Sequence, residues 1–135
     1  MQKPLGRIDV IAASATGIVP GVIPLVRART LSVTTRVTFG ASIDADAVVC
    51  VYYSPDGNNW DTYVLTSWAI TFDTSETEQI TKIIDVPEHG HIQIKVTNGS
   101  SADTLTNAIV WYSIQSWAET KAQSRGLINT ADVYD

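Results

Sequence analysis

The stretch L31-S32-V33-T34-T35-R36-V37-T38-F39 decides the fold class of this chain. Its odd-numbered positions are mostly apolar and its even-numbered positions are polar. Successive side chains of a β-strand point to opposite faces, so this alternation predicts a half-buried strand. Segment 91–97 alternates in the same way, and segment 80–86 does so less regularly. No helical period of useful length occurs before residue 117, so we expect an all-β chain.

Two other segments, 46–54 and 108–117, are apolar at odd and even positions alike. Strands that are apolar on both faces are normally covered on both faces. One face can meet the second sheet of a sandwich. We expect an arm of the same chain, or another subunit, to cover the other face.

Short strands separated by turns rich in Gly, Asp and Asn predict an antiparallel β-sandwich of the jelly-roll or Ig-like type. The immunoglobulin Cys…Trp…Cys framework is absent, because Cys50 is the only cysteine. The 135 residues suit one domain. We expect a basic N-terminal arm or first strand over 1–29, a sandwich body over 30–117 and an extended C-terminal arm over 118–135.

The segment S54-P55-D56-G57-N58-N59-W60 carries the residues that a tight turn requires. It predicts a β-hairpin over residues 48–62, with a type I turn and a bulge. The segment also resembles the Asp-box of sialidase-type propellers, Ser-x-Asp-x-Gly-x-Thr-Trp. Gly57 follows Asp56 directly, so the pattern is one residue short, and the chain is too short for a propeller. The likeness therefore supports a hairpin and not sialidase activity.

Charge is unevenly distributed along the chain. Residues 1–29 carry a net charge of +3, and residues 30–117 carry −7. A basic leading segment can bind a neighbouring copy or an acidic partner surface. The acidic body argues against nucleic acid as the ligand. There is no signal-peptide pattern and no apolar run long enough to span a bilayer, so we expect a soluble protein that is made in the cytoplasm.

Few residues offer catalytic or metal-binding chemistry. Cys50 lies in an apolar run and is expected to be a small buried hydrophobe. His89 and His91 could bind zinc only with a third ligand, and a turn followed by a strand explains them as well. Several loop acids could surround a calcium ion, but no EF-hand spacing is present and solvated loop acids are favoured. These acids are Asp44, Asp46, Asp56, Asp61 and Asp73. We therefore expect no enzymatic activity, no metal and no cofactor.

The four tryptophans and the tyrosines could form a platform on which sugars stack, but aromatic side chains also build sandwich cores and subunit interfaces. We favour the core or an interface. The sequence N98-G99-S100 matches a glycosylation sequon, which matters only in a secreted protein. Without a signal peptide, we interpret it as a turn.

With the S-P-D-G-N-N-W hairpin and the strand V110-W111-Y112-S113-I114-Q115-S116-W117, the chain resembles small β-sandwich virion proteins of tailed bacteriophages. These are head decoration (cement) proteins or neck and tail accessory proteins. The resemblance covers residues 30–117 and lies in length, acidic β-rich body, hairpin, strand and terminal arms. It implies a non-enzymatic protein that binds assembled capsid or tail protein as a symmetric oligomer.

On this hypothesis, copies associate through the outward apolar faces of segments 46–54 and 108–117, and both arms lie across neighbours. The expected interface residues are Val49, Val51, Tyr53, Trp111, Trp117, Arg27, Arg29, Leu127, Ile128 and Tyr134. The expected partners are the major capsid protein or other virion proteins and the chain itself, most often as a trimer, with no nucleic acid and no membrane. The protein would be made in the host cytoplasm and reside in the virion. The alternatives are a neck or tail accessory protein and a carbohydrate-binding module.

Overall fold

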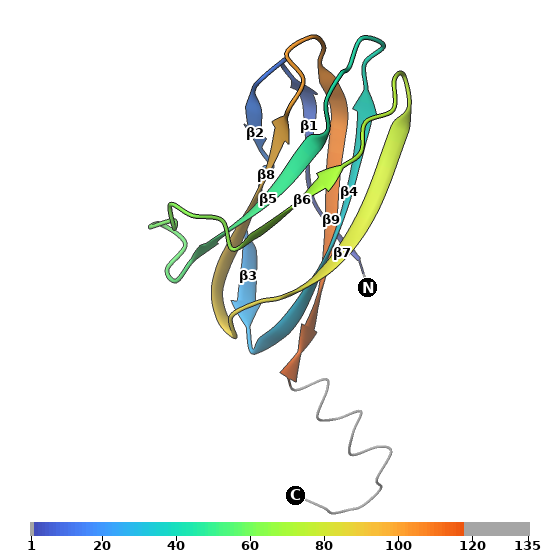
Figure 1. Cartoon of the computed structure of the whole chain (residues 1–135). Coiled ribbons are helices and arrows are strands. Elements are labelled where there is room, and N and C mark those ends of the chain that lie inside the picture. Colours follow the sequence, from blue (N-terminus) through green and yellow to red (C-terminus); the bar gives the residue numbers. More distant parts are fainter. Residues whose placement is uncertain (1, 118–135) are drawn as a thin grey trace, which may run out of the picture.

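The computed structural model describes residues 2–117, which fold into two antiparallel sheets packed face to face (Figure 1). The first sheet has the strand order β1 (Lys3–Ile11), β9 (Leu105–Ser116), β4 (Ala28–Phe39) and β7 (Thr77–Asp85). The second sheet has the order β2 (Thr16–Ile18), β8 (His89–Asn98), β5 (Ala47–Ser54) and β6 (Thr66–Ile70), and β3 (Ile23–Val26) also pairs with β8. Among these residues, no helix is long and apolar enough to cross a membrane.

This order decides between the two sandwich types that the sequence left open. If β2 and β3 are counted as one interrupted strand, each sheet has four strands. The last strand, β9, then lies between β1 and β4, and β8 lies between β2–β3 and β5. This is the double Greek-key arrangement of a jelly roll. The predicted all-β sandwich is confirmed.

Strand β4 shows why the alternating stretch forms a strand in the middle of a sheet. Leu31, Val33 and Val37 are fully buried between the sheets, whereas Arg36 points outward and is exposed. β4 pairs with β9 on one side and with β7 on the other over most of its length. Each fully buried aliphatic side chain contributes roughly 1.5–3 kcal/mol relative to exposure. The period-two pattern therefore fixes the face of β4 that enters the core.

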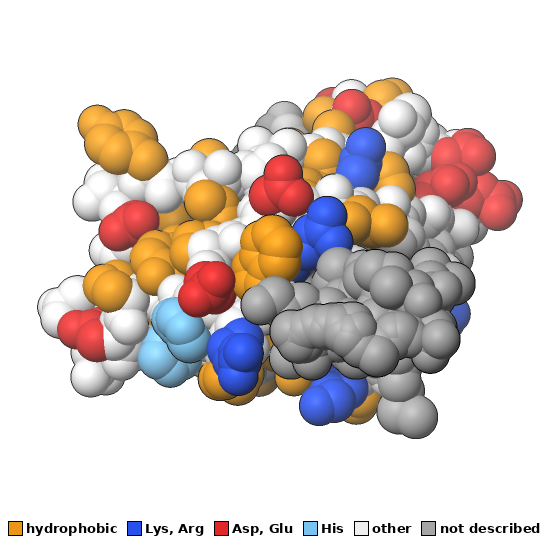
Figure 2. Space-filling view, turned by 90° about the horizontal axis from the view of Figure 1, so that it is seen from below, with side chains coloured by type: hydrophobic (Ala, Val, Ile, Leu, Met, Phe, Trp, Pro, Cys, Tyr) orange, Lys and Arg blue, Asp and Glu red, His pale blue; other side chains and the backbone are white. Residues whose placement is uncertain are grey.

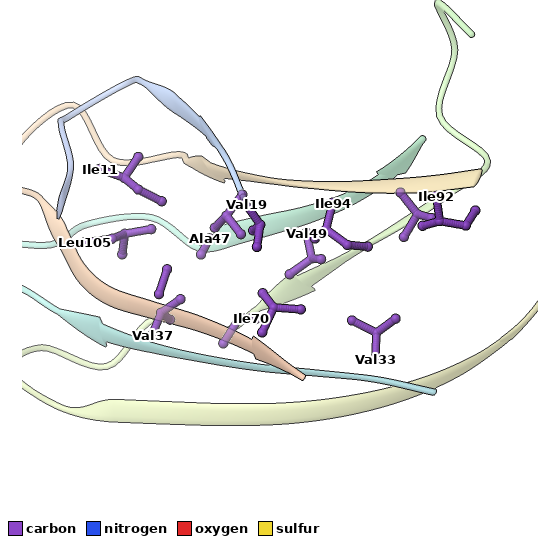
Figure 3. Packing of buried hydrophobic residues seen from close by; sticks show 14 of the residues in the cluster. Ile11, Val19, Val33, Val37, Ala47, Val49, Ile70, Ile92, Ile94 and Leu105 are labelled. Atoms are coloured by element: carbon purple, nitrogen blue, oxygen red, sulfur yellow. The ribbon is translucent and has the colours of Figure 1, made fainter. Parts of the chain in front are cut away.

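The core lies between the two sheets and is almost wholly aliphatic (Figure 3). Val33, Val37 and Leu105 enter it from the first sheet, and Val49 and Ile94 enter it from the second. Phe39 is the largest side chain that is fully buried. Because both sheets supply bulky branched residues at alternate positions, the two inner faces can interdigitate. Thr35 of β4 is a polar exception, fully buried on the same inward face.

Residues 3–26 supply three strands to the sandwich body. β1 pairs with β9 in the first sheet, and β2 and β3 pair with β8 in the second. Val19, Ile23 and Leu25 are buried in the core. For segment 1–29 the sequence left an arm or a first strand open, and the structure shows strands within residues 3–26. The predicted C-terminal arm, 118–135, lies outside the described residues.

The two-faced apolar strands β5 and β9 have no third layer over their outward sides within residues 2–117. On β5, the outward side chains of Val48 and Cys50 are half-buried by the neighbouring strands β6 and β8. On β9, Ile109 and Trp111 are half-buried in the same way between β1 and β4. The N-terminal segment joins both sheets through backbone hydrogen bonds and does not cover either outward face. The expectation that an arm of the same chain covers these strands is therefore not met by residues 2–26.

The predicted hairpin is longer than its turn signal suggested. β5 ends at Ser54, but the returning strand β6 begins only at Thr66, so the prediction that the hairpin closes by residue 62 is wrong. The intervening loop keeps two ladder-like bonds, since the backbone N–H groups of Asp61 and Leu65 donate to the carbonyls of Tyr53 and Val51. The turn residues predicted the bend, but residues 60–65 mix polar and apolar side chains without a period and gave no signal for the strand start.

Candidate ligand groove and apolar end

The outward face of the first sheet carries a groove of about 380 Å³. The residues lining it come from the N-terminal segment and from β4, β7 and β9, and they are Gln2, Thr34, Arg36, Gln79, Thr81 and Trp111. Its volume lies near the lower end of the roughly 300–1,000 Å³ usual for small-molecule sites. The groove therefore has the size of a site for a small ligand or for part of a polymer.

Strand register brings these side chains together. Thr34 lies opposite Trp111 on one side and Thr81 on the other, and Arg36 lies opposite Gln79. All of them are at outward positions of the alternating pattern. Residues directly opposite one another in antiparallel strands have side chains about 5 Å apart. Two adjacent rungs of the sheet thus form the floor of the groove.

Hydrogen bonds hold the polar side chains of the floor in place. The hydroxyl groups of Thr34 and Thr81 are hydrogen-bonded at 2.8 Å. The Gln2 amide nitrogen donates to the Thr34 hydroxyl at 3.4 Å, and Arg36 Nε donates to Gln79 Oε1 at 3.1 Å. The polar groups around the groove are therefore oriented by one another before any ligand arrives.

Trp111 and Arg36 form the centre of the groove. The guanidinium carbon of Arg36 lies over the Trp111 ring, 5.1 Å from the ring centroid, which is a cation–π distance. None of the six lining residues is acidic. Among residues 2–117, no carboxylate lies within ion-pair distance of Arg36. The groove therefore combines aromatic surface, amide and hydroxyl groups and one cation that lacks a carboxylate partner among these residues.

A second set of surface residues consists of exposed apolar side chains at two places, which we together call the apolar end. Val26 and Trp117 lie where β3 and β9 end, and Tyr63, Val64 and Leu65 lie on the loop between β5 and β6. Tyr63 is 85% exposed, Val26 66% and Trp117 44%. Figure 2 looks at this end and shows hydrophobic side chains between charged ones. Large exposed apolar patches that are rimmed by polar residues mark interaction sites.

Two arginines are part of the same end. The guanidinium of Arg29 lies over the Trp117 ring, 5.1 Å from the centroid. The backbone N–H of Trp117 donates to the Arg27 carbonyl at 2.8 Å. Arg27 has a φ of 53°, in the left-handed region that few non-glycine residues adopt, at the turn from β3 into β4. These contacts hold Trp117, directly after β9, against the turn between β3 and β4.

Loop 55–65, which carries three residues of the apolar end, is ordered by Asp56. The Asp56 carboxylate accepts hydrogen bonds from the backbone N–H groups of Asn58 and Asn59, both at 2.8 Å, and from the Asn59 amide at 2.7 Å. It also accepts from the Ser54 hydroxyl at 3.0 Å. These donors hold the pKa of Asp56 well below its usual value. Asp56 is thus a turn residue, as the turn pattern predicted.

The structure separates the predicted interface residues into five groups. Val49 and Val51 are fully buried in the core, so the prediction that they lie at an interface is corrected. The reason is parity, because β5 presents its odd-numbered residues 47–51 to the opposite sheet. Tyr53 is half-buried against the core, and its hydroxyl donates to the His89 carbonyl at 2.7 Å.

The remaining predicted interface residues lie elsewhere. Trp111 lines the groove, whereas Trp117, Arg27 and Arg29 belong to the apolar end. The final group lies outside the described residues and consists of Leu127, Ile128 and Tyr134. The predicted single interface therefore combines residues from two separate surfaces, the groove and the apolar end.

Other candidate chemistry gives no site in residues 2–117. No group of three or more His, Cys, Asp or Glu side chains is placed to hold a metal ion there. Asp44 accepts a hydrogen bond from the Ser100 hydroxyl at 2.6 Å, and Asp46 accepts one from the Phe72 backbone N–H at 3.0 Å, so these acids secure loops. Burial raises the pKa of the Cys50 thiol, with Lys95 opposing this, and a raised pKa makes a thiol a poor nucleophile.

The sequon residue Asn98 is almost fully buried. Its side-chain amide donates to the carbonyls of Ile11, Ala12 and Asp103, at 3.3, 3.3 and 2.8 Å. Its side-chain oxygen accepts from the Ser100 backbone N–H at 3.0 Å. The amide that a glycan would modify is therefore committed to joining three chain segments, in keeping with the interpretation of a turn.

Five groove residues were missed by sequence reasoning, which had singled out only Trp111. They are Gln2, Thr34, Arg36, Gln79 and Thr81. Their only signal is that most of them stand at polar positions of alternating strands, a property shared with many other residues. What makes them a site is the pairing of β4 with both β7 and β9, which a single sequence does not specify.

Comparisons with known proteins give a likeness in fold alone. No family model and no curated protein matches the sequence. Among solved structures, the C-terminal CBM6 of LamC, a marine laminarinase from Zobellia galactanivorans, is 12% identical with a TM-score of 0.50, over 84% of this chain and all of that chain. At this identity, the match supports the β-sandwich and nothing about binding.

Two further structures are more distant. A chain of the T13 IBDV viral particle is 12% identical with a TM-score of 0.48, over 85% of this chain and 30% of that one. A Family 16 Carbohydrate Binding Module-2 is 12% identical with a TM-score of 0.41, over 78% and 72% of the two chains. These scores are too low to carry an argument about function.

Proposed function

We propose that this protein is a non-enzymatic virion structural protein of a tailed bacteriophage. In this role it binds an assembled capsid and stabilises it as a decoration or cement protein. The observation that carries the proposal is the apolar end, where Val26 and Trp117 are exposed beside Arg27 and Arg29, and Tyr63 is exposed on the loop between β5 and β6. A monomer in water gains nothing from this surface, whereas burying it against a protein shell contributes about 25 cal/mol per Å² before association costs.

Charge supports contacts between copies. The loops at the opposite end of the sandwich, 12–15, 40–46, 71–76 and 99–104, contain no Lys or Arg. They carry five acids, which are Asp44, Asp46, Asp73, Glu76 and Asp103. Oppositely charged surfaces steer association and fix its orientation. A ring of copies, with a trimer favoured, can therefore place Arg27 and Arg29 of one copy near acidic loops of the next.

The fold is compatible with this role and also with carbohydrate binding. Jelly-roll sandwiches recur in viral capsid proteins and in lectins, which is an argument by analogy of fold. A neck or tail accessory protein would use the same apolar end on a different virion partner. Saccharide binding depends on another surface, the groove on the first sheet.

The first test is whether the protein is part of a particle. Phage particles induced from a culture of the source cells would be banded on a density gradient and washed in high salt. We expect this chain in the particle band by mass spectrometry, in a fixed ratio to the major capsid protein. Recovery of the chain only among soluble proteins would contradict the proposal.

The second test is the apolar end itself. The triple variant Tyr63→Ser, Val64→Ser, Leu65→Ser removes exposed apolar surface from a loop and spares the core. We expect light scattering to show a defined oligomer for the natural protein and a smaller species for this variant. The matched control is Ile18→Ser, because Ile18 is 54% exposed on β2 and lies outside the apolar end. An oligomer that both variants leave unchanged would show that the apolar end is not the interface.

A further inference from the structure

The groove on the first sheet is distinct from the apolar end, and the virion role does not use it. We propose that it binds a saccharide that bears a carboxylate group, such as a uronic acid residue of a polysaccharide. In this site Arg36 holds the carboxylate, Trp111 supplies apolar surface to the sugar ring, and the neighbouring amide and hydroxyl groups bind sugar hydroxyls.

Arg36 is oriented for this task. Its Nε donates to Gln79 Oε1, and its guanidinium lies over the Trp111 ring. These two contacts fix the plane of the guanidinium and engage neither of its terminal nitrogens. A guanidinium with both terminal nitrogens available binds a carboxylate through two parallel hydrogen bonds. Because the Arg36 guanidinium is already held in one orientation, less side-chain entropy is lost when the ligand binds.

The rest of the floor suits sugar hydroxyls. Gln2, Gln79, Thr34 and Thr81 present amide and hydroxyl groups, each of which can donate or accept a hydrogen bond. Trp111 is half-buried, so its ring is supported from below while one part faces the groove. A site that combines one aromatic side chain with several convergent polar groups matches a ligand with an apolar ring face and a polar rim.

The backbone around the groove argues against a peptide as the ligand. An extended peptide binds well to a sheet when it can pair with an unpaired strand edge. Here the floor is made by β9, β4 and β7. β4 and β9 are already paired on both sides, and only the outer edge of β7, which faces away from β4, is unpaired. A peptide lying on this face would find side chains but few backbone partners, whereas a saccharide needs only side-chain groups.

Charge selects an acidic sugar over a neutral one. Arg36 is the single charged residue of the groove lining, and it has no acidic partner among residues 2–117. The chain as a whole has a net charge of −5, so long-range attraction of anions does not explain this arrangement. A cation without a counterion next to hydrogen-bonding groups is complementary to a single carboxylate at short range.

The experiment uses the full chain, trigalacturonic acid and its methyl ester, which has the same sugar rings without the negative charges. Calorimetry should give a higher affinity for the acid than for the ester. Arg36→Ala should lower the affinity for the acid about 10-fold or more, as expected for the loss of a charged hydrogen-bonding pair, and should change that for the ester little. Trp111→Ala should weaken the binding of both.

A matched control comes from the second arginine–tryptophan pair. Arg29 lies over Trp117 at the same 5.1 Å distance but outside the groove, so Arg29→Ala should leave saccharide binding unchanged. Circular dichroism spectra of all variants establish that they are folded, and Arg36→Lys tests the two-nitrogen contact without removing charge.

Three results would overturn the inference. The first is equal binding of the acid and the ester. The second is an equal effect of Arg36→Ala and Arg29→Ala. The third is binding that appears only when residues 118–135 are removed, because the groove would then hold a segment of this protein and not a sugar. None of these results bears on whether the chain is found in virions.

Discussion

At the scale of single residues, Asp56 shows how a short motif secures a loop far longer than itself. Four donors surround its carboxylate, and all of them come from residues 54–59. They favour the charged form, which is why its pKa is depressed. A group with a depressed pKa in the folded state stabilises that state above the pKa of the unfolded chain. This contribution is lost as pH falls through the folded-state pKa.

We therefore predict that the loop is sensitive to acid only below the normal carboxylate range. The amide resonances of Asn58 and Asn59 should keep their native shifts at pH 4 and lose them at lower pH, in a single titration followed by NMR. In Asp56→Ala, both amides should exchange rapidly with solvent at every pH, because the acceptor is gone. Native shifts in that variant would mean that the loop does not depend on Asp56.

At the scale of elements, the strands that the sequence predicted are those with long alternating or continuous apolar patterns. β4, β5, β8 and β9 all have this property, and each pairs with strands on both sides. β6 was missed, and β2 and β3 were anticipated only as part of an arm or first strand over 1–29, because all three are three to five residues long and show too few alternations. β1 carries a register shift between Pro4 and Gly6, and this interrupts its pattern.

The edge strand β7 offers a test of register between adjacent residues. Ile83 is 72% exposed on the outward face, whereas Ile84 is half-buried and packs against the core. We predict that Ile83→Lys changes the free energy of unfolding by less than about 0.5 kcal/mol. Ile84→Lys should cost about 2 kcal/mol or more, since it places a charge against apolar side chains. Chemical denaturation of both variants measures the difference, and equal losses would mean that β7 has another register.

At the scale of the whole molecule, the described sandwich needs nothing beyond residue 117 for its core. Every buried residue of the cluster lies between Ile11 and Val110. A variant that ends at residue 117 should therefore keep its β-sheet circular dichroism spectrum and melt within about 4 °C of the full chain. A variant that begins at residue 12 should melt far lower, because it loses β1 and exposes the edge of β9. Unfolding of the shorter C-terminal variant would contradict this division.

The arrangement of strands in the whole molecule explains why the candidate sites were harder to predict than the fold. The fold depends on patterns within single strands, and these are visible in the sequence. The groove depends on which strands are neighbours, since Thr34, Gln79 and Trp111 are separated by dozens of residues. The apolar end similarly joins a turn, a loop and a strand end. Trp111 and Trp117 were singled out together, yet they belong to different surfaces.

The position of β9 between β1 and β4 has a consequence for the order of events during synthesis. The first sheet cannot close until the ribosome has made the chain through residue 116, because its central strand comes last in the described chain. Until then β1 and β4 expose unpaired edges and apolar faces, and such nascent chains are prone to misassociate. Pairing of strands so distant in sequence is also slow. The nascent protein should therefore depend on chaperone protection until translation of β9 is complete.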